Sequence, residues 1–137
     1  MNSLYKAHVN KDTGMVQTVK EHSENTARLC MQFAVPPLKD LMYVLGLLHD
    51  IGKYQSSFQK RMEGVSVQVE HSICGAMEAK RRYPDAFGLL IEYCIAGHHS
   101  GIPDGGAYND TPDQRTLCGR LKRETEDYSV YEEELSL

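Results

Sequence analysis

The segment from Pro37 to Ile51 places the strongest constraint on how this chain can fold. Its apolar residues recur every three or four positions, and the run LMYVLGLL (41–48) widens the apolar stripe. We therefore expect a largely buried helix that Gly52 can terminate. His49 and Asp50 follow the run directly, and an ionised carboxylate at the edge of an apolar helix needs a paired charge or a metal ion. The sequence thus predicts a cation site at one end of a core helix.

Further segments show the periodicity and the end signals of helices. The pair Pro36–Pro37 stops one of them, and Tyr83–Pro84 ends another. The expected helices cover residues 19–34, 55–62, 72–82 and 85–98, and a last one begins near Thr111 or Pro112. An irregular arm to about Thr18, the segment 63–70 and a loop over 100–112 complete the chain. The predicted fold class is an all-α helical bundle.

Length and charge limit the number of domains and the kind of partner. The chain has 137 residues, 41% of them hydrophobic, which suits one domain. Its net charge of −4 is the wrong sign for gripping nucleic acid by electrostatics alone. Residues 1–125 carry 15 basic and 14 acidic residues, so the excess of acid lies after them. We expect one domain over 1–125 and an acidic tail, or the start of a linker, over 126–137.

Membrane insertion and disulfide bonding are not expected. The longest apolar run is far shorter than the ~20 residues that span a bilayer, and the N-terminus lacks the apolar stretch of a signal peptide. The four cysteines are widely spaced and form no C-x-x-C pair, which argues against a disulfide framework or a zinc finger. We therefore predict a cytoplasmic protein with reduced thiols and no membrane partner.

Five of the six histidines lie at the ends of expected helices, where side chains can converge on one site: His22, His49, His71, His98 and His99. Neighbouring helical residues point about 100° apart, so His49 and Asp50 can straddle two metal ions with the carboxylate bridging them. Imidazole-rich ligation favours manganese, iron, cobalt, nickel or zinc over magnesium. The sequence predicts up to two divalent transition-metal ions per chain.

Each of these residues also has an ordinary structural interpretation. His49 and Asp50 can form a simple ion pair, and His98 with His99 can lie at a helix C-terminus because the helix dipole favours them there. His71 can pair with Glu70. Taken singly, each of these positions therefore leaves both the metal site and the ordinary interpretation open.

Four strings carry a family resemblance: EHSENTARL, GLLHDIGKYQSSFQKRM, VEHSICGA and IAGHHSGIPDGG. In this order and spacing they resemble the HD-type nuclease domain of the CRISPR-associated nuclease-helicase of type I systems. The resemblance runs from about His8 to Arg123. It implies an HD-domain helical bundle with a metal site between helix ends.

The resemblance also implies roles for particular residues. His22, His49 and Asp50 would hold a first metal, and Asp50, His71, His98 and His99 a second. The implied activity is metal-dependent hydrolysis of DNA, mainly single-stranded, with His49, Asp50 and Lys53 as catalytic residues. Lys53 lies one turn past His49, where it can contact a substrate phosphate or simply suit the helix dipole. We expect His8 to be structural.

The implied partners are single-stranded DNA and a CRISPR-associated helicase domain, fused or separate, and through it the crRNA-guided surveillance complex. The family completes its first metal site with an aspartate on a later helix, and this chain ends before such a helix. We therefore expect the sequence to be part of a longer chain.

Two other functions compete with the nuclease. One is an HD phosphohydrolase acting on nucleotides, which would need a pocket for a base and a sugar instead of an open groove. The other is a noncatalytic, metal-stabilised docking module, for which metal removal would change stability while no phosphodiester is cut.

Overall fold

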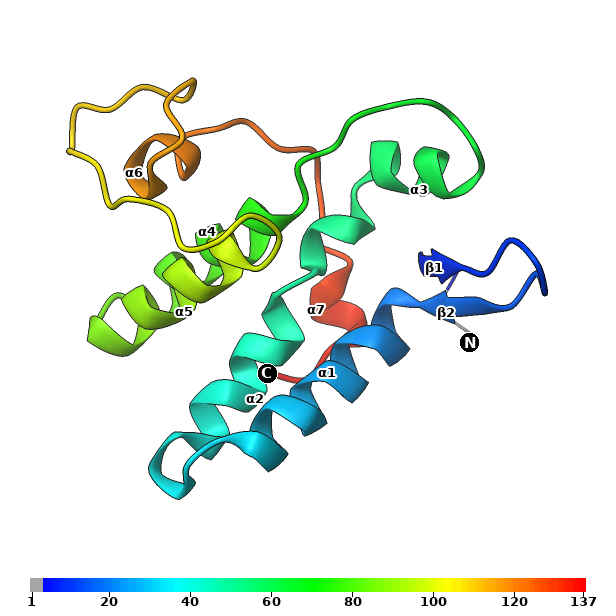
Figure 1. Cartoon of the computed structure of the whole chain (residues 1–137), viewed down its shortest axis with the longest axis horizontal. Coiled ribbons are helices and arrows are strands. Elements are labelled where there is room, and N and C mark those ends of the chain that lie inside the picture. The colour runs from blue at the N-terminus through cyan, green and yellow to red at the C-terminus, as the bar shows by residue number, and fades with distance from the viewer. Residues whose placement is uncertain (1–3) are drawn as a thin grey trace.

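The structure, a computed structural model, describes residues 4–137. Within this range the chain forms seven α-helices, two short 3-10 helices and one β-hairpin (Figure 1). The prediction of a helical bundle is confirmed. Residues 1–3, at the start of the expected irregular arm, lie outside the described residues.

The first layer is a pair of antiparallel helices. Helix α1 (Val19–Phe33) and helix α2 (Lys39–Leu48) lie side by side and are joined by the 3-10 turn η1 (Pro36–Leu38). A capping box starts α1, because the Thr18 side chain accepts from the backbone of Glu21 while the Glu21 side chain accepts from the Thr18 backbone. This pairing fixes where the helix begins, three residues before His22.

The second layer is another helix pair. Helix α4 (Ser72–Arg82) has the predicted boundaries, and helix α5 (Ala86–Gly97) begins where the Asp85 side chain accepts from two backbone amides. A Cβ on Gly75 would overlap the carbonyl oxygen of Leu48, so α4 lies directly against the end of α2. The core joins both layers and includes Leu47, Leu48, Ile51, Ile73, Cys74, Ile91 and Ile95.

The connecting segments agree with the sequence in part. In the chain, η2 (Ile51–Tyr54) and α3 (Ser56–Met62) follow the first helix pair, and residues 63–70, which have no regular structure, as expected, lead to the second. The helix expected from Thr111 or Pro112 is much shorter than the sequence suggests. Only α6 (Leu117–Arg120) forms, because the Thr116 side chain caps it there and the preceding residues make turns.

Two further differences involve residues near the site. The predicted helix over 37–51 ends at Leu48, and the chain then makes a turn that carries His49 and Asp50 inward. The expected irregular arm is instead a hairpin of β1 (Lys6–Val9) and β2 (Val16–Thr18). Its turn is closed by the Asn10 side chain, which accepts from two backbone amides.

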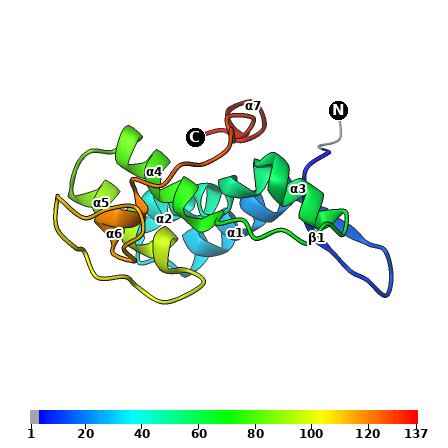
Figure 2. The ribbon, with the colours of Figure 1, turned by 90° about the horizontal axis from the view of Figure 1, so that it is seen from above.

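The acidic segment 126–137 packs against the bundle. It contains α7 (Tyr131–Glu134), which lies on one side of the helical layers in Figure 2. Tyr131 is 1% exposed and Leu135 is 5% exposed. The hydroxyl of Tyr54 donates to the Glu134 carboxylate at 2.6 Å. Apolar burial therefore holds this segment, although its charge alone suggests a solvated tail.

The remaining expectations concern membranes and cysteines. Within residues 4–137, no helix combines the length and the hydrophobicity that crossing a bilayer requires. The four cysteines are free thiols, as expected, and Cys74 is fully buried. Burial raises the pKa of the Cys74 thiol to about 12, so it stays protonated and packs as an apolar group.

Candidate metal centre

The six predicted ligands come together at the junction of the two helix layers. His22 comes from the start of α1, and His49 and Asp50 from the turn after α2. His71 precedes α4, while His98 and His99 follow α5. Asp50 lies at the centre and is 2% exposed. Helix ends thus deliver every one of these side chains, as the sequence predicts.

One oxygen of Asp50 faces a first group of histidines. Its Oδ2 lies 2.9 Å from the Nε2 of His22 and 3.2 Å from the Nε2 of His49. The two Nε2 atoms are 3.1 Å apart. Both rings therefore direct the same nitrogen to one point beside the carboxylate.

The other oxygen faces a second group. Asp50 Oδ1 lies 3.4 Å from the Nε2 of His71 and 3.3 Å from the Nε2 of His98. The Nε2 atoms of His71 and His99 are 2.8 Å apart. In each group the nearest candidate ligand atoms lie within 4.8 Å of one another. Asp50 is common to both groups and offers a different oxygen to each.

Backbone carbonyls determine which ring nitrogen carries the proton in two of the histidines. The Nδ1 of His49 lies 2.6 Å from the carbonyl oxygen of Gly46, and the Nδ1 of His98 lies 2.6 Å from that of Ile95. A carbonyl only accepts, so each Nδ1 carries a proton and donates it. Each Nε2 is then left free to bind a cation, as in most histidine-metal sites.

The geometry fits divalent transition metals. Ligand atoms about 2.0–2.2 Å from one metal lie about 2.8–3.6 Å from each other in tetrahedral or octahedral geometry. Six of the separations within the two groups, from 2.8 to 3.4 Å, fall in this range, and all the ligand atoms of each group lie within 4.8 Å of one another. Asp50 Oδ1 is buried and makes no hydrogen bond with described residues, which a bound cation would correct. His71 lacks the second contact that orients His49 and His98, because its Nδ1 is buried and has no hydrogen-bond partner among the described residues.

Lys53 supplies the nearest fixed positive charge. Its Nζ lies 2.9 Å from Asp50 Oδ2, and the residue is only 4% exposed. The ammonium group also donates to the Nε2 of His8 at 3.3 Å. Lys53 is thus placed at the first group, although here its charge is paired with Asp50 and not exposed to solvent.

The cluster shifts the pKa values of its members. Burial raises the pKa of Asp50, but the close imidazole nitrogens of His22, His49 and His98 outweigh burial and lower that pKa strongly. Burial lowers the pKa of His71 to about 4. Burial lowers the pKa of His98, but the neighbouring Asp50 carboxylate outweighs burial and raises that pKa. Asp50 is therefore ionised and His71 neutral at pH 7, the states that metal binding requires.

His8 was expected to be structural, yet it lies at the edge of the first group. Strand β1 carries it there, and its ring is 4.8 Å from that of His22. The signal that would have found it is the turn sequence Asn10 to Gly14, which predicts a hairpin leading into the first helix. Its contact with Lys53 makes it part of the site's surroundings.

A glycine allows the two groups of candidate ligands to lie close together. A Cβ on Gly52 would overlap the backbone of His71, including its carbonyl oxygen. Only hydrogen in place of a side chain lets η2 approach the start of α4 this closely. The sequence suggests Gly52 as a helix terminator, and the structure shows that close packing at the site is its second role.

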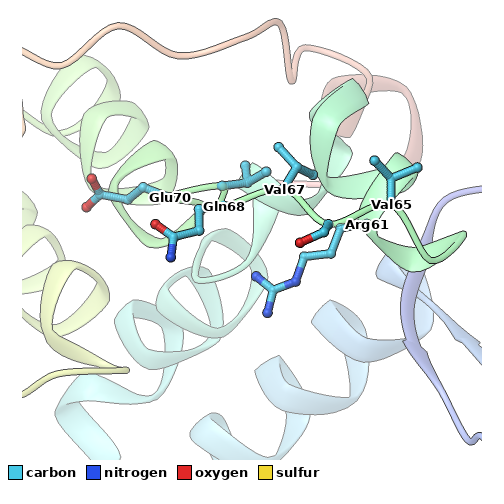
Figure 3. A pocket seen from close by; sticks show the side chains of 7 residues that line it. Arg61, Val65, Val67, Gln68 and Glu70 are labelled. Atoms are coloured by element: carbon cyan, nitrogen blue, oxygen red, sulfur yellow. The ribbon is translucent and has the colours of Figure 1, made fainter.

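Two hollows flank the second group and share Glu70, the residue before His71. One, of about 830 Å³, follows the segment 65–70, where Arg61 and Gln68 point to one side and Val65 and Val67 to the other (Figure 3). The second, of about 550 Å³, lies between the loop after His99 and α6. The cluster histidines line neither hollow.

The comparison with protein families agrees with this site. The HD domain family model matches residues 19–131, a span that includes both histidine groups, and the chain belongs to this family. HD domains are generally metal-dependent hydrolases of the phosphohydrolase superfamily. A search of curated proteins finds no match. The class of protein is thus an HD-domain hydrolase.

Proposed function

We propose that this HD domain is a metal-dependent nuclease that hydrolyses phosphodiester bonds of mainly single-stranded DNA. It would act in CRISPR interference in the cytoplasm, together with a helicase domain that is fused or separate. The observation that carries the proposal is the placement of Asp50, whose two oxygens face two separate histidine groups. A carboxylate shared in this way could bridge two metal ions at the short separation that two-metal phosphodiester hydrolysis uses.

The residues present define how two ions would be held. The first group offers His22, His49 and Asp50, and the second offers Asp50, His71, His98 and His99. Divalent ions held there would act as Lewis acids toward the phosphodiester. The donor set favours manganese, iron, cobalt, nickel or zinc over magnesium. Lys53 holds the Asp50 carboxylate from the side opposite the second group, through the 2.9 Å contact with Oδ2.

The open surroundings of the cluster support a polymeric substrate. The side chains of His22 and His98 are each 21% exposed, so a phosphodiester can reach the groups from solvent. A nucleotide-specific enzyme would instead need a recess for the base and the sugar next to its ligands. Arg61 and Arg115, one in each flanking hollow, are exposed and have no ion pair among the described residues. Both are free to contact a strand on either side of the metal groups.

The charge balance supports dependence on a partner. Residues 1–125 are nearly neutral and the segment after them is acidic, so the domain offers little general attraction to DNA. We expect weak binding that falls quickly as salt rises, and delivery of the strand by the helicase partner.

The test combines metal content with a cleavage panel. The metal-free chain is loaded in turn with manganese, cobalt, nickel and magnesium, then incubated with labelled single-stranded DNA, duplex DNA and a set of nucleotides. We expect cleavage of single-stranded DNA with the transition metals and none by Asp50→Ala, which removes the shared ligand. Lys39→Ala, remote from the cluster on α2, serves as the matched control.

The other functions predict different outcomes. Hydrolysis of nucleotides without cleavage of DNA would replace the nuclease with a nucleotide phosphohydrolase. Metal binding that raises the unfolding temperature without any hydrolysis would indicate a docking module. Wild-type cleavage by Asp50→Ala would contradict the two-metal assignment.

A further inference from the structure

The second metal group depends on two chain segments that are far apart in sequence. His71 lies at the start of α4, whereas His98 and His99 follow the end of α5. Helices α4 and α5 pack on each other through apolar side chains, and such contacts are not directional, so they do not by themselves set the positions of the polar helix ends. A shift of the two ends would separate the Nε2 atoms of His71 and His99, which are 2.8 Å apart.

Arg120 of α6 bridges these two ends. It is 8% exposed, and its Nη1 donates to the carbonyl oxygen of Ala96 at 2.7 Å. Its Nε and Nη2 donate to the Glu70 carboxylate at 2.9 and 2.6 Å, and Nη2 also donates to the hydroxyl of Ser72 at 3.0 Å. Glu70 and Ser72 are the residues on either side of His71. One guanidinium thus holds both ends at once.

The same turn of α5 holds the His98 ring and the arginine. The carbonyl oxygen of Ile95 accepts from His98 Nδ1, and the next carbonyl, that of Ala96, accepts from Arg120. Movement of the Arg120 contact would therefore move the carbonyl that orients the His98 ring. The Glu70 carboxylate is further fixed by an ion pair with Arg123.

Helix α6, which carries Arg120, is held in place by capping, burial and backbone hydrogen bonds. The Thr116 side chain caps this helix by accepting from the backbone of Gly119, and Leu117 is buried in the core. Backbone hydrogen bonds from Leu117 and Cys118 to Asp104 and Gly105 tie α6 to the loop that follows His99. The position of the guanidinium is therefore set by the fold and does not depend on a flexible segment.

We propose that Arg120 is a positioning residue for the second metal group: its planar fork sets His71 and the His98–His99 pair at ligating distance. This inference rests on the proposed function, in which that group binds a metal. Lysine cannot replace it, because one ammonium on a flexible stem cannot reach the Ala96 carbonyl, Glu70 and Ser72 together.

The test measures metal affinity apart from activity. Cobalt is titrated into the full chain in a His22→Ala background, which leaves the second group as the more complete site, and the cobalt absorption spectrum reports the ligand geometry. Loss of a group bonded directly to a metal ligand weakens metal binding by roughly 10–100-fold, and since Arg120 bonds the neighbours of the ligands, a loss of about 10-fold is the expected size. We expect that loss for Arg120→Met and for Arg120→Lys, with an altered spectrum, and a smaller loss for Ser72→Ala.

The matched control is Arg82→Met. Arg82 bonds to Glu78, Glu132 and the Tyr131 hydroxyl, so it joins α4 to α7 without contacting the cluster. Its replacement should lower the unfolding temperature without changing the cobalt affinity or the spectrum. A matching loss of affinity in Arg82→Met would show that general destabilisation, and not positioning, explains the effect of Arg120.

The results separate the two proposals. Absence of cobalt binding both in the unmodified chain and in the His22→Ala background would overturn the proposed function itself. Cobalt binding by the parent, together with equal affinity in Arg120→Lys, would overturn the positioning role alone. If Arg120→Met does not fold, Arg120→Lys and Ser72→Ala still decide the question.

Discussion

Replacing Asp50 with asparagine keeps the shape of the side chain but removes the negative charge beside Lys53. The Nζ of Lys53 and the Oδ2 of Asp50 are 2.9 Å apart, and their side chains are 5% and 3% exposed. In the metal-free protein the ammonium group of an Asp50→Asn variant would remain buried with no carboxylate to pair with it. The variant should therefore lose folding stability as well as metal binding.

The size of this loss follows from the burial of the pair. Removing one partner of a buried ion pair costs about 3–5 kcal/mol, because the other charge is left uncompensated. With a urea m-value of about 2 kcal/mol/M for a protein of this size, the unfolding midpoint should fall by about 1.5–2.5 M. Adding Lys53→Met removes the stranded charge and should restore about 2 kcal/mol.

The assay is a double-mutant cycle by urea unfolding. The parent chain, Asp50→Asn, Lys53→Met and the double variant are compared in EDTA at pH 8.5, two units above the ordinary histidine pKa of about 6.5. At this pH the imidazoles contribute little charge, so the coupling free energy reports the lysine-aspartate pair. Far-UV circular dichroism confirms that each variant is folded before denaturation.

One result would refute the reasoning. If Lys53→Met lowers the unfolding free energy as much in Asp50→Asn as in the parent chain, the two effects are additive. The pair would then not be coupled, and Lys53 would not balance the charge of Asp50.

Three further predictions follow from other parts of the structure. Gly52→Ala should cost about 1–3 kcal/mol in unfolding free energy, because the new methyl overlaps the His71 backbone, and should weaken cobalt binding in titrations. At one equivalent of cobalt, His99→Ala should lower metal stoichiometry more than His22→Ala, since the second group has more ligands; equal losses would contradict this. Burial raises the pKa of Glu78, but hydrogen bonds from neighbouring arginines outweigh it and lower that pKa below 4.5. The free energy of unfolding of the parent should therefore exceed that of Glu78→Gln by about 1–3 kcal/mol above about pH 4.5. This difference should disappear as the pH falls through the lower pKa of Glu78 in the folded state, which urea unfolding at stepped pH would measure.

Local patterns predicted the main helices because their causes are local. The proline pair ends α1 and opens the next segment, and Asp85 starts α5. The same reasoning placed the last helix wrongly, since the residues after Thr111 form turns that reach α6 only at Leu117. The hairpin at the N-terminus was also missed, because three- and four-residue strands have little periodicity to detect.

The sequence by itself determined which side chains are available for the site and that helix ends carry them. An aspartate directly after an apolar helix, followed by histidines at later helix ends, already predicts a cation site. The sequence also suggested that the Asp50 carboxylate bridges two metal ions. The tertiary structure alone decided which histidines each Asp50 oxygen faces, that Lys53 pairs with Asp50, and that His8 lies beside them. It also decided the bridge from Arg120 to the two ends that carry His71 and His98. These contacts join residues up to about fifty positions apart, and such pairs depend on how helices pack, which local patterns do not encode.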